Sequence, residues 1–460
     1  EFRDKVLAFS EVEALGVDYE AVHRNLIDEV LASQSLDDIG LMIYTSGSTG
    51  KPKGAMIRYG NIRAVAPGII ERLGLDEGSR HLSYLPLCHV AEQMLTTFTP
   101  IYLGSQVNFG ESLRTVQEDL REVAPTLFLG VPRIWEKLHA SINIRIHETG
   151  SLRRKLFDKA LAACESFARK AAHQRTLGER LTFAFYYVLI LRALQNYIGL
   201  RNAKVALTGA APISPAIISF FRALGVPLVE VYGLTESTGM VFGQRLDHVQ
   251  LGTVGAAISG IDYRIAETGE LQIKGGAVFA GYYKNAEATA ASIRDGWLHT
   301  GDVVKEFDGD IKIVDRLKDI MITAGGKNLT PSEIENGMKA SPYIKECIVV
   351  ADGRNFVSAL IQIDFETVGK WAERNRMAFT HFRSLVENPQ VRELVAEEIN
   401  KANSKLAQVS QVRKFHLLTK ELDHDDGEVT ATMKVRRSSI YKTYEKEIEA
   451  MYGKGGLANA

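Results

Sequence analysis

The segment that most constrains this chain is residues 44–54, which read YTSGSTGKPKG and follow the apolar run at 41–44. It combines four serine or threonine hydroxyls with three glycines and two lysines. Glycine lets backbone N–H groups approach an anion closely, hydroxyls donate further hydrogen bonds, and lysine supplies mobile positive charge. Because the apolar run reads as a buried strand, the loop would leave a strand end, where open α/β sheets bind ligands. The pattern predicts a polyphosphate-binding loop rather than an ordinary flexible surface loop.

This loop differs from a Walker A loop. In that motif a serine or threonine follows the lysine and its hydroxyl contacts magnesium. Here Lys51 is followed by Pro52. A magnesium ligand, if one is needed, is therefore expected elsewhere in the chain.

Composition narrows the class of protein. The 460 residues are too many for one ordinary domain and enough for two or three. Hydrophobic residues make up 45% and charged residues 24%, which is a globular composition, and the net charge of -1 argues against nucleic-acid binding. The cysteines show no metal-site spacing and no disulfide framework, which suits a reducing cytoplasm. They are Cys88, Cys164 and Cys347.

The chain divides into regions of different texture. Residues 1–140 mix strands and helices, and residues 136–200 are almost free of glycine and proline, which predicts a helical insertion. From residue 203 short apolar runs alternate with helical segments, with strands expected at 204–208 and 228–232, and this alternation implies a largely parallel sheet.

A small β subdomain is expected at 254–314, where glycines are frequent and short strands dominate. A hinge is expected at 315–319, followed by a compact α+β domain at 320–460. The predicted fold is therefore α/β. A large N-terminal domain (1–314) of layered parallel sheets with helices carries the β subdomain and precedes a smaller, mobile C-terminal domain.

The apolar run at 181–192 is too short to span a membrane, and we expect a buried helix there. Basic residues beside this aromatic-rich run could rest on an anionic membrane surface. We favour a solvated helical insertion as their explanation. The basic residues are Arg145, Arg153, Arg154, Lys155, Lys159, Arg169, Lys170, Arg175 and Arg180.

A second motif, residues 231–237 (VYGLTES), follows a predicted strand. Gly233 permits a tight turn that presents the phenol of Tyr232 and the side chains of Thr235 and Glu236 together. An aromatic face can stack on a purine, a hydroxyl can donate to phosphate, and a carboxylate can hold Mg²⁺. On its own, this segment could equally be a capped strand-to-helix turn.

Together, these two motifs resemble the phosphate loop and the tyrosine-glycine-x-threonine-glutamate motif of the adenylate-forming enzymes. That superfamily contains acyl-CoA synthetases, luciferases and peptide-synthetase adenylation domains. The resemblance implies that ATP phosphates bind the loop, that Tyr232 and Gly233 border the adenine, that Thr235 contacts phosphate, and that Glu236 is the magnesium ligand. The loop residues concerned are Thr45, Ser46, Gly47, Ser48, Thr49, Gly50, Lys51 and Lys53.

Three further positions complete the implied nucleotide site. Asp302, in WLHTGD, resembles the carboxylate that binds the ribose hydroxyls, and Arg316 resembles its companion from the hinge strand. Gly209 lies in a small-residue turn that borders adenine and the acyl group in similar enzymes. Alone, Asp302 could be a turn aspartate and Arg316 a surface ion pair; the order of all the motifs favours the site.

The C-terminal motifs resemble the parts that serve two half-reactions. Lys318 matches the family's hinge residue. Gly326 lies in a glycine-containing segment that would let the pantetheine arm of coenzyme A pass close to the backbone. The alternative is that this segment is a simple Gly-Gly hairpin. Lys434 matches the catalytic lysine, whose charge would offset repulsion between carboxylate and α-phosphate. An isolated lysine among basic neighbours is otherwise a solvated residue.

Two residues relate to the acyl group. His89 matches a position beside the acyl carboxylate, with a core histidine as an equal alternative. Trp135, in VPRIWEK, resembles the segment of long-chain and bubblegum-type acyl-CoA synthetases and would line the acyl tunnel, or else serve as a packing aromatic.

The resemblance runs from residue 37 to residue 437 in family order. It implies a ligase that activates a long-chain fatty acid with ATP and Mg²⁺ and transfers it to coenzyme A. A carrier-protein acceptor and a nucleotide-binding scaffold without turnover remain alternatives. Only 43 residues precede Tyr44, so we expect that the family's N-terminal subdomain, with part of the substrate pocket, is missing.

Overall fold

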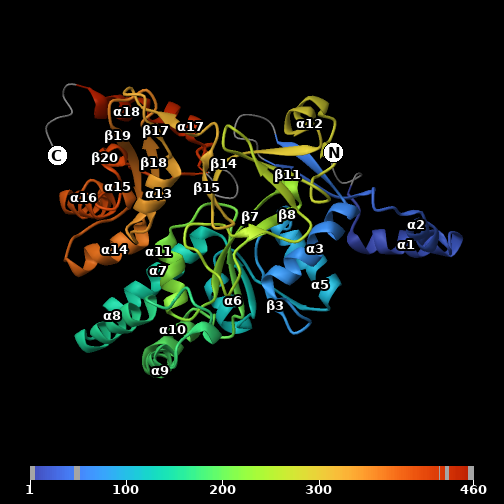
Figure 1. Cartoon of the computed structure of the whole chain (residues 1–460), viewed down its shortest axis with the longest axis horizontal. Helices are drawn as coiled ribbons and strands as arrows, with labels where there is room; N and C mark the ends of the chain where they lie inside the picture. The colour runs from blue at the N-terminus through green and yellow to red at the C-terminus, as the bar shows by residue number, and fades with distance from the viewer. Residues whose placement is uncertain (1–5, 46–51, 424, 430–434, 454–460) are drawn as a thin grey trace.

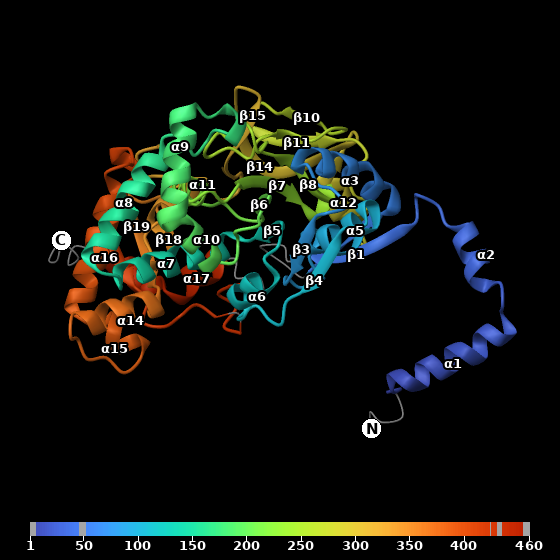
Figure 2. The same cartoon turned by 90° about the horizontal axis from the view of Figure 1, so that it is seen from below.

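The N-terminal helices extend away from the rest of the chain. The computed structural model describes residues 6–45, 52–423, 425–429 and 435–453. Neither α1 (Phe9–Val22) nor α2 (Leu26–Ser33) contains a buried residue, and both lie apart from the other elements (Figure 2). The chain then enters an antiparallel hairpin of β1 (Ile39–Thr45) and β2 (Lys53–Arg58), in which Thr45 pairs with Lys53.

A seven-stranded sheet forms the centre of the large domain, in the order β4-β3-β5-β6-β7-β8-β9. Its strands β3 to β7 are parallel, as predicted, and β8 and β9 add antiparallel to one edge. The strands are β3 (Arg80–Ser83), β4 (Gln106–Phe109), β5 (Leu127–Gly130), β6 (Val205–Thr208), β7 (Leu228–Leu234), β8 (Gly239–Gly243) and β9 (Ala256–Ala257).

Helices cover both faces of this sheet, so its inner strands are buried on both sides. Along β5, Leu127 and Leu129 belong to one apolar cluster, whereas Phe128 belongs to another. This alternation follows from the two-residue period of a strand. The helices are α3 (Tyr59–Leu73), α4 (Val90–Glu92), α5 (Thr99–Leu103), α6 (Val116–Val123), α7 (Pro132–His147), α8 (Ser151–Glu165), α9 (Leu177–Tyr186), α10 (Arg192–Tyr197) and α11 (Pro215–Ala223), with a π-helical turn at Gln93–Phe98.

The predicted β subdomain region contains a five-stranded antiparallel sheet, built around β14 and its neighbours. Its members are β10 (Asp262–Ile265), β11 (Glu270–Lys274), β13 (Ile293–Arg294), β14 (Trp297–Phe307) and β15 (Asp310–Arg316), with α12 (Ala286–Ser292) alongside. The short strand β12 (Gly281–Tyr282) instead joins the β1–β2 hairpin.

The C-terminal region has apolar clusters of its own, around the sheet β18-β19-β20. It begins with the hairpin β16 (Met321–Ile322) and β17 (Asn328–Leu329), and Gly326 lies in its turn with φ +73°. The other elements are β18 (Ile344–Val350), β19 (Val357–Ile363), β20 (Val412–Leu417), α13 (Pro331–Lys339), α14 (Phe365–Arg374), α15 (Phe382–Val386), α16 (Pro389–Asn403), α17 (Arg437–Thr443) and α18 (Glu445–Tyr452). The predicted α/β fold, with a smaller α+β domain after the large one, is confirmed.

Ion pairs join the C-terminal region to the helices of the large domain. Arg133 of α7 lies 3.0 Å from the Asp364 carboxylate, and Arg374 lies 3.5 Å from Glu148. Both C-terminal partners flank or end α14, and Figure 1 shows that helix beside α7. The C-terminal domain therefore rests against the helical insertion in this conformation.

The expectation of a buried helix at 181–192 is wrong. The segment is helical, through α9, a π-helical turn at Tyr187–Leu191 and the start of α10, but Leu181, Phe185, Val188 and Leu189 are exposed. Only Ile190 and Leu191 of this run are buried, because one face alone packs on the large domain. Across the part of the chain that the structure describes, no helix combines the length and apolar character needed to cross a membrane.

Candidate functional site

Asp302 lies at the centre of a cluster that joins β7 to the β14–β15 hairpin, two distant parts of the chain. Strands β14 and β15 pair so that Asp302 stands opposite Arg316. The Arg316 Nε lies 2.9 Å from Asp302 Oδ1, and the Tyr232 hydroxyl donates to Oδ2 at 2.5 Å. Asp302 itself is buried. The two expected nucleotide residues and the motif tyrosine therefore meet at the end of β7.

The charges of this cluster reinforce one another. Burial, and then the Asp302 carboxylate, raise the pKa of Tyr232, so its phenol keeps its proton. Burial on its own would lower the pKa of Arg316, but Asp302 and neighbouring groups outweigh it and the pKa is raised. The phenol and the guanidinium thus remain donors at neutral pH. Since a carboxylate offers about four acceptor positions, Asp302 is suited to bind hydroxyl donors as well.

The turn after β7 is fixed by close backbone contacts. A Cβ on Gly233 would lie 1.8 Å from the Gly239 carbonyl oxygen, so only glycine fits there. Thr235, Glu236 and Ser237 then form one turn of 3-10 helix. The Ser237 hydroxyl accepts from the Leu234 N–H at 2.9 Å, and the Glu236 carbonyl accepts from the Phe279 N–H at 3.0 Å. The turn is held on both sides, which orients the Glu236 carboxylate.

Glu236 has a partner that the sequence did not reveal. The Tyr282 hydroxyl donates to Glu236 Oε1 at 2.7 Å, and the Lys53 ammonium lies 5.2 Å from the centre of the Tyr282 ring. Burial, and then Glu236, raise the pKa of Tyr282. Tyr282 is therefore a neutral donor that connects the predicted magnesium ligand to the end of the predicted phosphate loop. It belongs to the two-residue strand β12, which carries no recognisable signal in the sequence.

The predicted phosphate loop connects two paired strands. Thr45 and Lys53 face each other at the loop end of the β1–β2 hairpin, and the Thr45 hydroxyl donates to the Lys53 carbonyl at 3.4 Å. The remaining predicted loop residues, 46–51, lie outside the described residues, as does Lys434. Lys53, Tyr282 and Glu236 place this end of the hairpin beside the turn after β7.

Gly209 and His89 lie on loops after two parallel strands of the central sheet, β6 and β3, which β5 separates. Gly209 directly follows β6, which pairs with β7, and a Cβ on it would lie 2.9 Å from the Val231 carbonyl oxygen. His89 precedes α4, is half-buried, and belongs to the loop after β3. Helix α4 packs against β8, just beyond the turn that contains Glu236. Both residues therefore lie at the carboxyl edge of the sheet, where the cluster is found.

Trp135 is a packing residue in this conformation. It is fully buried, its indole N–H donates to the carbonyls of Gly130 at 2.9 Å and Leu207 at 3.1 Å, and its ring meets Phe128 and Phe221 edge to face.

Of the two C-terminal positions, Lys318 follows β15 two residues after Arg316, and Gly326 lies in the β16–β17 turn.

Glu230 is a buried acid close to the cluster that the motifs did not identify. It lies on β7 two residues before Tyr232, and burial raises its pKa to about 8. Only its position in a strand that is buried on both faces could have indicated this, because a charged residue there must be neutralised or paired.

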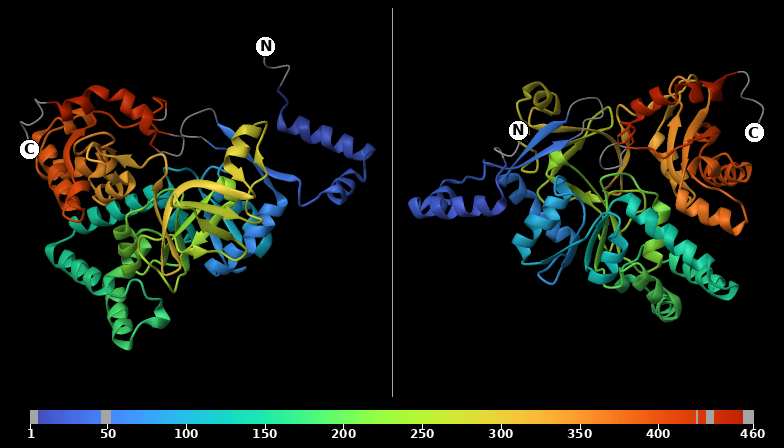
Figure 3. Two further views of the ribbon diagram at one scale, coloured as in Figure 1. Left: turned by 45° about the horizontal axis from the view of Figure 1, so that its top comes forward. Right: turned by 180° about the vertical axis from the view of Figure 1, so that it is seen from behind.

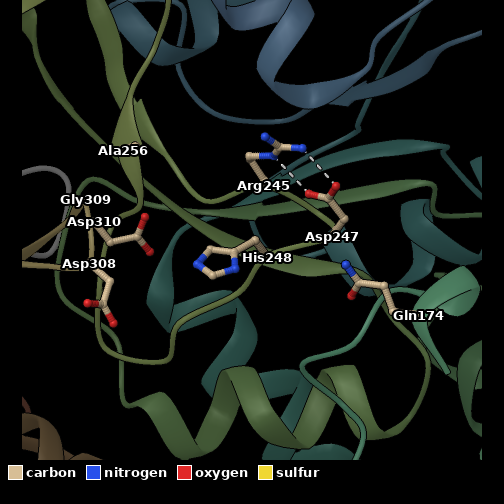
Figure 4. A pocket seen from close by; sticks show the side chains of 8 residues that line it. All are labelled: Gln174, Arg245, Asp247, His248, Ala256, Asp308, Gly309 and Asp310. Carbon is tan, nitrogen blue, oxygen red and sulfur yellow. Dashed lines mark hydrogen bonds and ion pairs between the residues drawn. The ribbon is translucent and has the colours of Figure 1, made fainter.

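A surface pocket lies away from this cluster. It is lined by the Arg245–His248 segment, the turn at 308–310 and Gln174, and Arg245 is paired with Asp247 at 2.9 and 3.0 Å (Figure 4). Asp310 begins β15 and Arg316 ends it, so about 20 Å of strand separates this pocket from Asp302. It contains none of the predicted site residues.

Comparison with known proteins gives the class. Residues 4–283 match the family model described as AMP-binding enzyme, and residues 318–455 match its C-terminal domain. The chain belongs to the AMP-binding, adenylate-forming enzyme family.

Relatives within the family extend the comparison. The chain is 33% identical to the long-chain-fatty-acid–CoA ligase FadD15 of Mycobacterium bovis, over 92% of this chain and 71% of that protein. It is 30% identical to the long-chain-fatty-acid–CoA ligase ACSBG2 of Mus musculus, over 93% of this chain and 68% of that protein.

Solved structures show the same fold. The adenylation domain of the carboxylate reductase from Mycobacterium chelonae aligns with TM-score 0.66 at 23% identity, over 91% of this chain and 61% of that chain. The o-succinylbenzoate coenzyme A synthetase of Bacillus subtilis, solved with ATP and magnesium, aligns with TM-score 0.60 at 20% identity, over 88% and 70%. The chain thus spans less than two thirds of the reductase chain that it matches.

Proposed function

We propose that this protein activates a long-chain fatty acid with ATP and transfers it to coenzyme A. A fatty carboxylate attacks the α-phosphate of ATP, which gives an acyl-adenylate and pyrophosphate. The thiol of coenzyme A then attacks the acyl carbon, and AMP leaves with one oxygen of the original carboxylate. The observation that carries this proposal is the cluster of Asp302, Arg316 and Tyr232 beside the Glu236 turn.

The cluster suits the nucleotide. Asp302 would accept two hydrogen bonds from the ribose hydroxyls while Tyr232 and Arg316 hold its orientation. The Arg316 guanidinium is cationic and at the end of its strand, where its remaining N–H groups would reach the α-phosphate. The predicted loop around 45–53 would hold the other phosphates, because Lys53 lies next to the Glu236 turn through Tyr282.

Glu236 suits a magnesium ion. Its carboxylate is held by the Tyr282 hydroxyl on one oxygen, and carboxylate oxygen is a ligand type that Mg²⁺ prefers. When bound, the ion would neutralise charge on the leaving pyrophosphate. Thr235 would donate to phosphate, and His89 would border the acyl carboxylate.

The C-terminal domain would serve the two steps in turn. Lys434 would neutralise charge during adenylation, and rotation about Lys318 would then bring the Gly326 segment to the pantetheine arm. The Arg133–Asp364 and Arg374–Glu148 ion pairs stabilise one of these positions. The preference for a long acyl chain rests on the 33% and 30% identical long-chain ligases.

The decisive experiment is ATP–pyrophosphate exchange driven by carboxylates of increasing chain length. Exchange that depends on a long-chain fatty acid, followed by thioester formation with coenzyme A, supports the proposal. If exchange occurs but a thioester forms only on an acyl-carrier protein, the acceptor is the carrier protein and not coenzyme A. A folded chain that shows no exchange with any carboxylate would contradict the proposal and favour a nucleotide-binding scaffold.

A further inference from the structure

Helix α9 exposes one apolar face to solvent. Leu177 is 74% exposed, Leu181 63%, Phe185 59% and Val188 75%. Leu177, Leu181 and Phe185 belong to α9, and Val188 belongs to the π-helical turn that continues it. Their spacing of four, four and three residues places them on one side of this helical segment. Helices α8 and α9 protrude together from the large domain, away from the central sheet (Figures 1 and 3). We call the four side chains the α9 apolar face; single exposed leucines are common, but a continuous row is not.

The same protrusion is strongly basic. Residues 151–192 contain nine lysines and arginines against three aspartates and glutamates, a net charge of +6 in a chain whose total is -1. One of the three acids, Glu179, is already paired with Lys170 at 2.6 Å. Arg153, Arg154 and Lys155 are exposed in the first turns of α8, and Arg192 is exposed just beyond the α9 apolar face. Helix α8 packs on α9 and on the π-helical turn, so these charges belong to one unit with that face.

We propose that the α8–α9 protrusion docks on the surface of an anionic phospholipid bilayer. The α9 apolar face would enter the boundary between headgroups and acyl chains, and the basic residues would contact the phosphates, as in interfacial amphipathic helices. The positive charge of the protrusion favours an anionic bilayer over a second copy of this chain as its binding partner. Two copies of this chain meeting through this face would bring +6 against +6, whereas an anionic bilayer complements both the charge and the apolar row.

The proposed membrane docking does not depend on which acid the enzyme activates. It requires no membrane-crossing segment, because interfacial helices lie in the plane of the membrane. The exposed apolar residues of α1 and α2 lie elsewhere on the molecule (Figure 2), so variants can separate the two surfaces.

The test is flotation of the chain with vesicles of phosphatidylcholine alone and of phosphatidylcholine with phosphatidylserine. The wild type should float with the anionic vesicles only, and added salt should weaken binding. The L181Q/F185Q/V188Q variant should lose about tenfold or more in partitioning. The R153Q/R154Q/K155Q variant should lose about fivefold per charge, roughly a hundredfold in all. All six positions are exposed, so both variants should keep the thermal unfolding curve of the wild type.

The matched control is I101Q/F109Q, which removes apolar side chains that are 75% and 72% exposed in α5 and β4. It should float like the wild type. The proposal is overturned if the wild type does not bind anionic vesicles, or if the α9 variant binds as well as the control. It is also overturned if the wild type sediments as a dimer that L181Q/F185Q/V188Q converts to a monomer, since the face would then belong to a second copy.

Discussion

Replacing Glu230 by glutamine should remove a large pH dependence of the stability of the large domain. Glu230 is 8% exposed on β7, and burial raises its pKa from 4.5 to about 8. Each unit of pKa difference between folded and unfolded chains corresponds to about 1.4 kcal/mol. The shift of about 3.5 units therefore corresponds to roughly 5 kcal/mol between the protonated and ionised forms.

The sign follows from the proton that the folded chain retains. Between pH 4.5 and pH 8 the folded chain holds the Glu230 proton and the unfolded chain has released it. The unfolded state then binds fewer protons, so the free energy of unfolding falls as the pH rises through this window. Below pH 4.5 Glu230 is protonated in both states, so its burial does not lower the free energy of unfolding. Above pH 8 Glu230 is ionised in both states, and the free energy of unfolding is lowered by the full amount.

The assay is urea unfolding of the wild type and Glu230→Gln at several pH values, followed by tryptophan fluorescence, to which Trp135 and Trp297 of the large domain and Trp371 of the C-terminal domain contribute. The two proteins should be similarly stable near pH 5, and the variant should be more stable by several kcal/mol near pH 9. Glu77→Gln, at an exposed position, should follow the wild type. Parallel pH dependences of wild type and Glu230→Gln would show that burial does not keep Glu230 protonated in the folded chain.

Three further changes test the site and the domain contact. Asp302→Asn should raise the KM for ATP by about 10- to 100-fold, since hydrogen bonds to a charged group contribute about 1.5–3 kcal/mol; Asp308→Asn, at the exposed far turn, should not change it. Lys434→Ala should stop adenylation yet spare thioester formation from supplied acyl-adenylate, and equal loss of both steps would count against its role. Arg133→Ala removes the pair with Asp364 and should speed proteolysis at the hinge by up to about fivefold; an unchanged rate would exclude a holding role for that pair.

Local patterns predicted most of the architecture. The expected strands at 204–208 and 228–232 are β6 (Val205–Thr208) and β7 (Leu228–Leu234), so their bounds differ by one or two residues. Such segments are predictable because two-residue and helical periods in apolar residues reflect which side faces the core. The structure also brings together Tyr232, Asp302 and Arg316, three residues that the motifs singled out.

Long-range features could not be predicted in the same way. The contact between Tyr282 and Glu236 joins residues 46 positions apart through a two-residue strand. A strand of two residues is too short to show a periodic pattern of apolar residues, so the sequence could not predict it. The run at 181–192 is mostly apolar and therefore predicts a buried helix, but burial depends on whether another element covers each face. In this structure one face of α9 stays uncovered.

The most direct test of the account follows oxygen from the fatty acid. The wild-type chain would convert a long-chain fatty acid labelled with oxygen-18 in its carboxylate, with ATP, Mg²⁺ and coenzyme A, and the products would be identified by mass spectrometry. If the site forms an acyl-adenylate, each turnover transfers one labelled oxygen to AMP and leaves one in the thioester. Unlabelled AMP, or label in inorganic phosphate, would contradict the central claim that this site activates the carboxylate at the α-phosphate.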